Sequence, residues 1–157
     1  MKSVYIKLNN LKTEEIEKII ISEFEHFDDW MDKYNYIIEA GKSLSALNEK
    51  YKTDNYVITG CQSKVWLHAF HENDKIFFEA DSDALITKGI ISLLVRILSG
   101  QPPDDITNAK LEFIDKIGLR EHLSPTRSNG LNSMIKQMKL YALAFKLKMS
   151  QNNSNSF

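Results

Sequence analysis

One stretch of the chain carries the pattern of two paired strands: Val65-Trp66-Leu67-His68-Ala69-Phe70-His71-Glu72-Asn73-Asp74-Lys75-Ile76-Phe77-Phe78-Glu79-Ala80. Both halves are rich in β-branched and aromatic residues, which favour extended backbone. Asn73 and Asp74 between them tolerate the left-handed angles of a tight hairpin turn. The sequence therefore predicts antiparallel strands from Val65 to His71 and from Lys75 to Ala80. A shorter run before them, Val57-Ile58-Thr59, predicts a third strand that ends in a turn at Gly60.

The segment that follows the hairpin is the most apolar of the chain. From Asp83 to Leu98, apolar residues occur on nearly every side of a predicted helix, so this helix is expected to be buried. Asp81-Ser82-Asp83 supplies a cap and early acidic charge, and Gly100 with the following prolines ends the helix. Further helices are predicted over 13–27, from Asp28-Asp29 onward, over 103–108 and 111–117, and after a loop at 123–130.

Strands flanked by helices predict an α+β fold in which a small antiparallel sheet of about three strands packs against helices. A chain of 157 residues suits one domain, so we expect residues 1–157 to fold as a single unit. Residues 1–12 are expected to form an N-terminal extension and residues 151–157 a frayed tail.

The composition is that of an ordinary globular protein, with 20 Lys and Arg residues against 21 Asp and Glu residues. This balance argues against a nucleic-acid partner or a polybasic membrane surface, because phosphate binding needs clustered positive charge. No apolar run approaches the length of a membrane span, and the first residues begin no signal peptide. We therefore expect a cytoplasmic protein whose thiol stays reduced.

Cys61 is the only cysteine of the chain, which limits the chemistry it can perform. An inert core residue is the commonest fate of a free cysteine. A structural zinc site would need about four ligands, and the four histidines show no ligand spacing, so no metal is expected. Thioredoxin-like redox work needs a second cysteine, and no signature of a cysteine hydrolase surrounds Cys61. A thiol that accepts a group and passes it on is the remaining interpretation.

The position of Cys61 favours this last interpretation over an inert core role. Gly60 allows a sharp turn between two predicted strands, and turn tips seldom hold core cysteines. A free thiol has a pKa of about 8.5, so little of it is thiolate at neutral pH. Such a thiol would need a partner to activate it, and without a resolving cysteine it cannot release its cargo as an internal disulfide.

Three separated motifs resemble the SufE family of sulfur acceptors for cysteine desulfurases. They are Gly60-Cys61-Gln62-Ser63-x-Val65-Trp66, then Ala80-Asp81-Ser82-Asp83-Ala84 with Lys88-Gly89, and Leu123-Ser124-Pro125-x-Arg127-x-x-Gly130-Leu131. An earlier segment, Trp30-x-x-Lys33-Tyr34-x-Tyr36-Ile37-Ile38 with Gly41, is similar to the N-terminal pattern of the family. The resemblance runs from about residue 20 to 145 and implies the fold that SufE proteins share with IscU-type scaffolds.

The resemblance implies that Cys61 takes sulfur from the persulfide of a pyridoxal-phosphate (PLP) cysteine desulfurase, the SufS-like partner. Sulfur would then pass to an iron–sulfur scaffold such as a SufBCD-like complex, and the desulfurase would be stimulated. The PLP stays on the partner, so no cofactor is expected in this chain, and a homodimer is permitted. Such a protein is an activator with a covalent persulfide rather than a stand-alone enzyme. Two readings stay open: a CsdE-like acceptor for another desulfurase, and a structural partner-binding domain in which Cys61 is inert.

Several neighbours of Cys61 are predicted to form its loop or contact a partner. Gly60, Gln62 and Ser63 are expected to shape the loop. The resemblance places Arg127 near the cysteine loop or the partner surface, against the alternative of a surface arginine before a helix. It places Asp83 in a segment implicated in partner contact, although a helix-start carboxylate also explains that residue.

Overall fold

The predicted hairpin forms the regular sheet of residues 11–154, the part of the chain that this computed structural model describes. Strand β1 (Val65–Glu72) pairs with β2 (Lys75–Ser82) in antiparallel register, from Val65 opposite Ser82 to Glu72 opposite Lys75. Asn73 and Asp74 have φ angles of 53° and 62°, as a type I′ turn requires. The hairpin and its turn are therefore confirmed.

The predicted third strand is wrong. Val57 makes a single antiparallel bridge with Trp66, and the Ile58 N–H donates to the Val65 carbonyl at 2.8 Å. Two short 3₁₀ helices, η1 (Glu49–Tyr51) and η2 (Asp54–Tyr56), precede this run, and the Gly60 turn follows it. The few residues left between them are too short to continue a ladder, so the sheet has two strands rather than about three.

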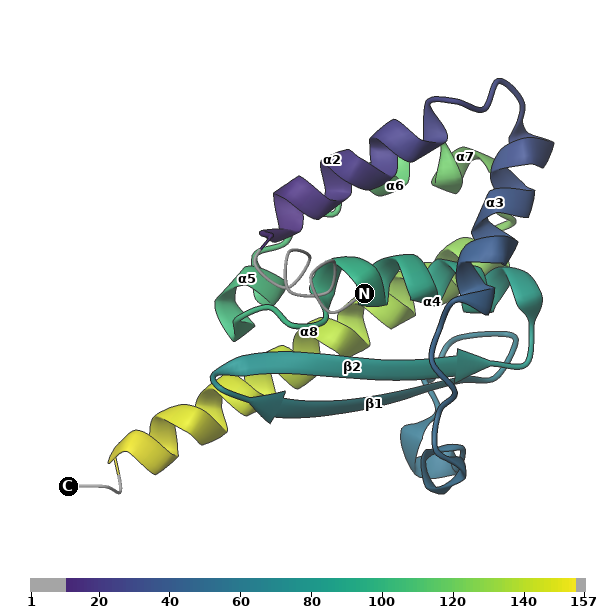
Figure 1. The fold of residues 1–157 in the computed structure, drawn as a ribbon. Coiled ribbons are helices and arrows are strands. Elements are labelled where there is room, and N and C mark those ends of the chain that lie inside the picture. Colours follow the sequence, from purple (N-terminus) through teal and green to yellow (C-terminus); the bar gives the residue numbers. More distant parts are fainter. Residues whose placement is uncertain (1–10, 155–157) are drawn as a thin grey trace.

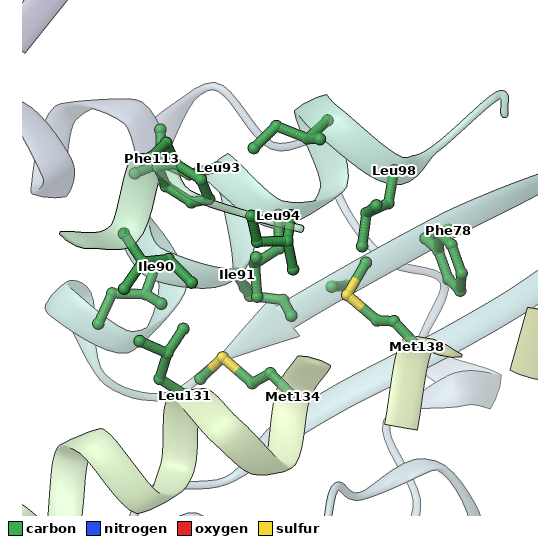
Figure 2. Packing of buried hydrophobic residues seen from close by; sticks show 14 of the residues in the cluster. Phe78, Ile90, Ile91, Leu93, Leu94, Leu98, Phe113, Leu131, Met134 and Met138 are labelled. Carbon is green, nitrogen blue, oxygen red and sulfur yellow. The ribbon is translucent and has the colours of Figure 1, made fainter. Parts of the chain in front are cut away.

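Helix α4 (Leu85–Leu98) is the buried helix that the sequence predicts. It contacts β2 and the helices α2 (Thr13–Phe24), α3 (Trp30–Lys42) and α8 (Pro125–Ser154). Figure 1 shows α4 above the hairpin, with the long α8 passing behind it. Figure 2 shows side chains of α8, among them Leu131 and Met134, directed toward the apolar side chains of α4. The α+β fold class is thus confirmed, with α4 at its centre.

Two glycines bring α3 and α4 into direct backbone contact. A Cβ atom added to Gly41 of α3 would lie 2.7 Å from the Gly89 nitrogen of α4. A Cβ atom added to Gly89 would overlap the backbone carbonyl and side chain of Ile37. No larger residue fits at this crossing, so these two glycines set the distance between the helices.

The C-terminal third of the chain consists of helices. After α5 (Pro103–Thr107), α6 (Phe113–Lys116) and α7 (Leu119–His122), α8 begins at Pro125, where the sequence predicted a loop as far as Gly130. The Ser124 hydroxyl accepts from the Arg127 N–H at 3.2 Å and thereby caps α8. Helix α8 contains basic but no acidic side chains.

The ends of the chain lie partly outside the described residues. Helix α8 continues to Ser154 and so includes part of the segment 151–157, which was expected to be frayed. Residues 1–10, most of the expected extension 1–12, and residues 155–157 are not described. Of the helices between residues 11 and 154, none combines the length and the apolar character needed to cross a bilayer.

Replacing Gly89 by Ala should destabilise the fold, because the new methyl group would overlap Ile37 at the crossing of α3 and α4. Forcing a methyl group into a packed interior costs about 1–3 kcal/mol. Urea denaturation of wild type and Gly89→Ala measures this loss. Ala144→Gly, at an exposed position of α8, calibrates the cost of a helix-propensity change alone, about 1 kcal/mol. A Gly89→Ala protein as stable as wild type would show that the two helices can separate without cost.

Candidate functional site

The loop that carries Cys61 is held at both ends and pressed against α8. The bond from the Ile58 N–H to the Val65 carbonyl closes its base. Gly60 has a φ of 100°, and a Cβ atom there would overlap the Ser133 hydroxyl of α8. Only glycine accommodates both the backbone angle and this close approach. Gly60, which the sequence predicts to shape the loop, thus lies at the turn of this loop against α8.

Cys61 is half-buried, and its thiol faces the second turn of α8. The Sγ atom lies 3.6 Å from the Gly130 carbonyl oxygen and donates to it. Burial raises the pKa of the Cys61 thiol above its ordinary value. The resting residue is therefore a protonated thiol at neutral pH, with its proton directed at a backbone acceptor.

A cavity of about 20 Å³ lies beside this thiol. Three elements line it: the loop (Cys61, Gln62, Ser63), α4 (Thr87) and α8 (Thr126, Arg127, Gly130, Met134). A volume of this size holds about one water-sized atom. The cavity can therefore accept one further atom beyond Sγ, but not a bulky substrate.

Arg127 projects from the first turn of α8 into the wall of this cavity. Its Nη1 atom donates to the Thr87 hydroxyl at 3.1 Å. Within residues 11–154, no carboxylate forms an ion pair with this guanidinium. The structure thus brings together Cys61, Gln62, Ser63 and Arg127, four of the residues predicted from the sequence.

Asp83 lies outside the cavity, at the open end of the hairpin. Its Oδ1 atom accepts from the Lys64 N–H at 3.0 Å, and its own N–H donates to the Lys64 carbonyl at 3.2 Å. Asp83 lies one residue before the N-cap Ala84 of α4, and its side-chain hydrogen bond is to the Lys64 N–H rather than to an N–H of the helix. Asp83 instead fixes Lys64, the residue that ends the cysteine loop.

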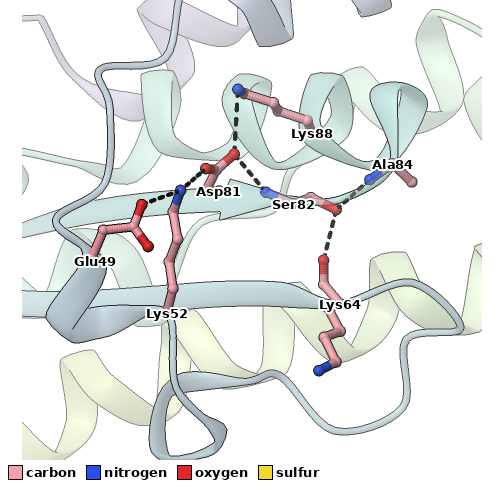
Figure 3. Close-up of polar contacts among 7 residues, drawn as sticks. All are labelled: Glu49, Lys52, Lys64, Asp81, Ser82, Ala84 and Lys88. Carbon is pink, nitrogen blue, oxygen red and sulfur yellow. Dashed lines mark hydrogen bonds and ion pairs between the residues drawn. The ribbon is translucent and has the colours of Figure 1, made fainter.

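Asp81 connects three segments around the base of the same loop (Figure 3). Its carboxylate lies 3.0 Å from Lys52 Nζ, which follows η1, and 3.2 Å from Lys88 Nζ on α4. Burial opposes ionisation of Asp81, but hydrogen bonds from Lys52, the Ser82 N–H and Lys88 outweigh it and lower its pKa. The neighbouring Ser82 hydroxyl donates to the Lys64 carbonyl at 2.8 Å. This network joins β2, α4 and the loop base.

Four residues that line the cavity were not among the site residues predicted from the sequence: Thr87, Thr126, Gly130 and Met134. Thr87 is one of several polar residues of α4, with Lys88, Ser92 and Arg96, so no local signal marks it as a site residue. Met134 follows Gly130 by four residues and so lies on the same side of α8. The spacing places Gly130 and Met134 on one side only if both residues are helical, which requires the helix to begin before Gly130, as it does at Pro125. In residues 11–154, no group of three or more His, Cys, Asp or Glu residues could hold a metal ion.

The site and fold together define an α+β protein that presents one protected thiol beside a one-atom cavity. Residues 18–142 match the profile of the SufE family, described as an Fe-S metabolism associated domain. The chain therefore belongs to the SufE family. Membership assigns it a role in sulfur transfer for iron–sulfur metabolism.

Individual proteins support this assignment. An uncharacterized SufE-like protein of Rhizobium etli is 42% identical over 125 residues, which are 76% of this chain and 84% of that protein. A chloroplastic/mitochondrial SufE-like protein of Arabidopsis thaliana is 37% identical over 137 residues, which are 87% of this chain but 37% of the plant protein. The solution structure of a hypothetical protein from Thermus thermophilus has a TM-score of 0.68 at 18% identity, covers 82% of this chain and 94% of its own, and supports the fold alone.

Replacing Asp81 by Asn should remove a pH-dependent part of the stability. The folded-state pKa of Asp81 is depressed, so its ion pairs stabilise the fold fully above the ordinary carboxyl pKa of 3.8. This contribution is lost as the pH falls further, through the depressed folded-state value. Urea denaturation from pH 7 down to pH 3 should therefore show a difference between wild type and Asp81→Asn that is constant near neutrality and begins to decrease as the pH falls below 3.8.

Asp74→Asn provides the matched control for this substitution. Asp74 lies exposed in the hairpin turn, where asparagine adopts the same backbone angles. A stability difference between wild type and Asp81→Asn that persists unchanged in acid would contradict the electrostatic role of Asp81.

Proposed function

We propose that this protein carries sulfur as a persulfide on Cys61. In this proposal Cys61 takes sulfur from a SufS-like, PLP-dependent cysteine desulfurase and delivers it to an iron–sulfur scaffold such as a SufBCD-like complex. One observation carries the proposal: in a SufE-family chain, a lone half-buried thiol faces a cavity of about 20 Å³. That volume accommodates one additional sulfur atom beyond Sγ.

The transfer is a displacement at sulfur, equivalent to thiol–disulfide exchange. The Cys61 thiolate attacks the outer sulfur of the donor persulfide, and a new S–S bond forms at Cys61. The S–S bond of the donor breaks, and the donor thiolate leaves with the electron pair and takes up a proton. No oxidant or reductant is consumed, so Cys61 needs no second cysteine.

The protected state of the thiol matches this task. Because burial raises the pKa of Cys61 and the Gly130 carbonyl accepts a hydrogen bond from the protonated thiol, the resting thiol is a poor nucleophile toward small electrophiles. A docked donor must therefore expose and activate it. Once loaded, a sulfur recessed in the cavity is less accessible to reductants in solution than one on the surface.

The partners in this proposal follow from the chemistry. Removing sulfur from the desulfurase frees that enzyme for another turnover, so the carrier stimulates it. The PLP belongs to the desulfurase, and this chain needs no cofactor of its own. A cytoplasmic location and a homodimer are both consistent with the proposal. A CsdE-like role with another desulfurase would use the same site and chemistry.

Incubation with a cysteine desulfurase, PLP and cysteine should add one sulfur atom to this protein. Intact-mass spectrometry should detect the addition in wild type, and a thiol reductant should reverse it. Cys61→Ser should gain nothing, because it lacks the accepting thiol. If wild type gains nothing while the desulfurase itself is loaded, the carrier function is wrong. A Cys61→Ser protein that still stimulates the enzyme fully would favour a structural binding domain.

Arg127→Ala should slow sulfur loading of Cys61 while leaving the fold intact, because it removes the positive charge beside the reacting sulfur. A hydrogen bond to a charged group is worth about 1.5–3 kcal/mol, so the loading rate should fall roughly tenfold or more. Quenched-flow mass spectrometry measures the rate, and circular dichroism measures the fold. Arg120→Ala is the control, since Arg120 pairs with Asp115 and Asn132 outside the cavity. Equal loading rates for Arg127→Ala and wild type would remove Arg127 from the site.

A further inference from the structure

Thr87 is a buried hydroxyl at the wall of the Cys61 cavity that the family motifs do not account for. Its exposed fraction is 5%, and it lies in the first turn of α4, the most apolar helix of the chain. Burying a hydroxyl without a hydrogen bond costs about 1–3 kcal/mol, whereas valine of the same shape would cost nothing. The buried hydroxyl of Thr87 must therefore be stabilised by the groups around it.

The hydrogen bond of Thr87 leaves its proton available. A threonine hydroxyl has one donor and two acceptor positions. Its oxygen accepts from Arg127 Nη1 at 3.1 Å. Within residues 11–154, the hydroxyl hydrogen is donated to no protein acceptor. Since Thr87 lines the cavity, this hydrogen is free to point into it.

Apart from the Gly130 carbonyl that accepts from the thiol, charged and dipolar groups of the other walls favour a negative charge. Arg127 contributes a guanidinium that no described carboxylate neutralises. Thr126 and Arg127 belong to the first turn of α8, whose N-terminal end is the positive end of the helix dipole. None of the residues that line the cavity is acidic. The cavity is thus a small site for an anion of about one atom.

We propose that Thr87 and Arg127 bind the terminal sulfur of the Cys61 persulfide as an anion, with the Thr87 hydroxyl as the hydrogen-bond donor. This inference rests on the proposed carrier function and deepens it. Loading extends the side chain by one S–S bond, about 2.0 Å. A persulfide is a stronger acid than the parent thiol, so its terminal sulfur releases its proton to solvent and carries the charge. The anion is then held by the hydroxyl and the guanidinium together.

This arrangement separates the resting state from the loaded state. The unloaded thiol donates to the Gly130 carbonyl and makes no use of the anion site. In this proposal the loaded sulfur reaches Thr87 and Arg127, which line the same cavity. Thr87 should therefore affect how long the persulfide survives, and not how reactive the free thiol is.

Two substitutions at one position test the role of the hydroxyl. Thr87→Val keeps the shape of the side chain but removes the hydroxyl, and Thr87→Ser keeps the hydroxyl. Each protein is loaded chemically with sodium polysulfide, freed of reagent and challenged with glutathione, and intact mass follows the persulfide. Thr87→Val should shorten the persulfide half-life about tenfold, the factor for losing one hydrogen bond to a charged group. Thr87→Ser should retain the half-life of wild type.

A second readout separates anion binding from a general effect on the loop. Alkylation of the loaded protein by iodoacetamide across pH reports the persulfide pKa, which should be higher in Thr87→Val than in wild type. Alkylation of the unloaded thiol should proceed equally in both. A slower or faster unloaded thiol in Thr87→Val, or a Thr87→Ser protein that behaves like Thr87→Val, would overturn the proposal. Equal half-lives for wild type and Thr87→Val would overturn it as well.

The Arg127→Ala background tests whether Thr87 touches the sulfur directly. If Thr87 only positions Arg127, adding Thr87→Val to Arg127→Ala has no further effect, and the direct bond is refuted. A further loss in the double variant supports it. Because polysulfide loads the protein chemically, this result does not depend on a desulfurase. If no desulfurase loads the wild-type protein, the carrier function is refuted. A persulfide half-life that depends on the Thr87 hydroxyl would still support the anion site.

Discussion

Burial of α4 is the constraint on which the rest of this structure depends. The helix is apolar on nearly every side, so it must be covered by β2, α2, α3 and α8 together. Gly41 and Gly89 set how closely α3 approaches, and the packing of Met134 and Leu131 sets the position of α8. Because α4 and α8 also form two walls of the cavity, core packing determines the geometry around the thiol.

The site combines elements that are distant in sequence, each with a separate physical task. The loop presents the thiol, α8 supplies the carbonyl that accepts a hydrogen bond from it, and α4 supplies a hydroxyl. Asp81 and Asp83 anchor the loop base through charge and backbone bonds without entering the cavity. Cys61 therefore carries the reactivity, while Asp81 and Asp83 fix the loop. The thiol can stay protonated and unreactive although its loop is held firmly in place.

Much of this organisation could be predicted from local signals. The Asn73-Asp74 turn and the apolar run of α4 specify their structures through backbone angles and burial, which depend on few neighbours. The third strand could not be excluded, because pairing of Val57 depends on what precedes and follows it. The start of α8 was misplaced because Gly130 suggested a loop, whereas Ser124 and Pro125 form the actual cap. Thr87 entered the site only through tertiary packing, which no local pattern records.

The absence of acidic side chains in α8 has a consequence for how this molecule meets others. A formal net charge of −1 conceals two opposing regions, since every acidic residue precedes α8 while the helix itself is positive. The protein therefore separates its charges along the chain although it is nearly neutral overall. Charges on a partner act on this basic helix over about 10 Å at ordinary salt. The distribution of charge along the chain, more than its net charge, therefore determines which side of the protein an anionic partner meets.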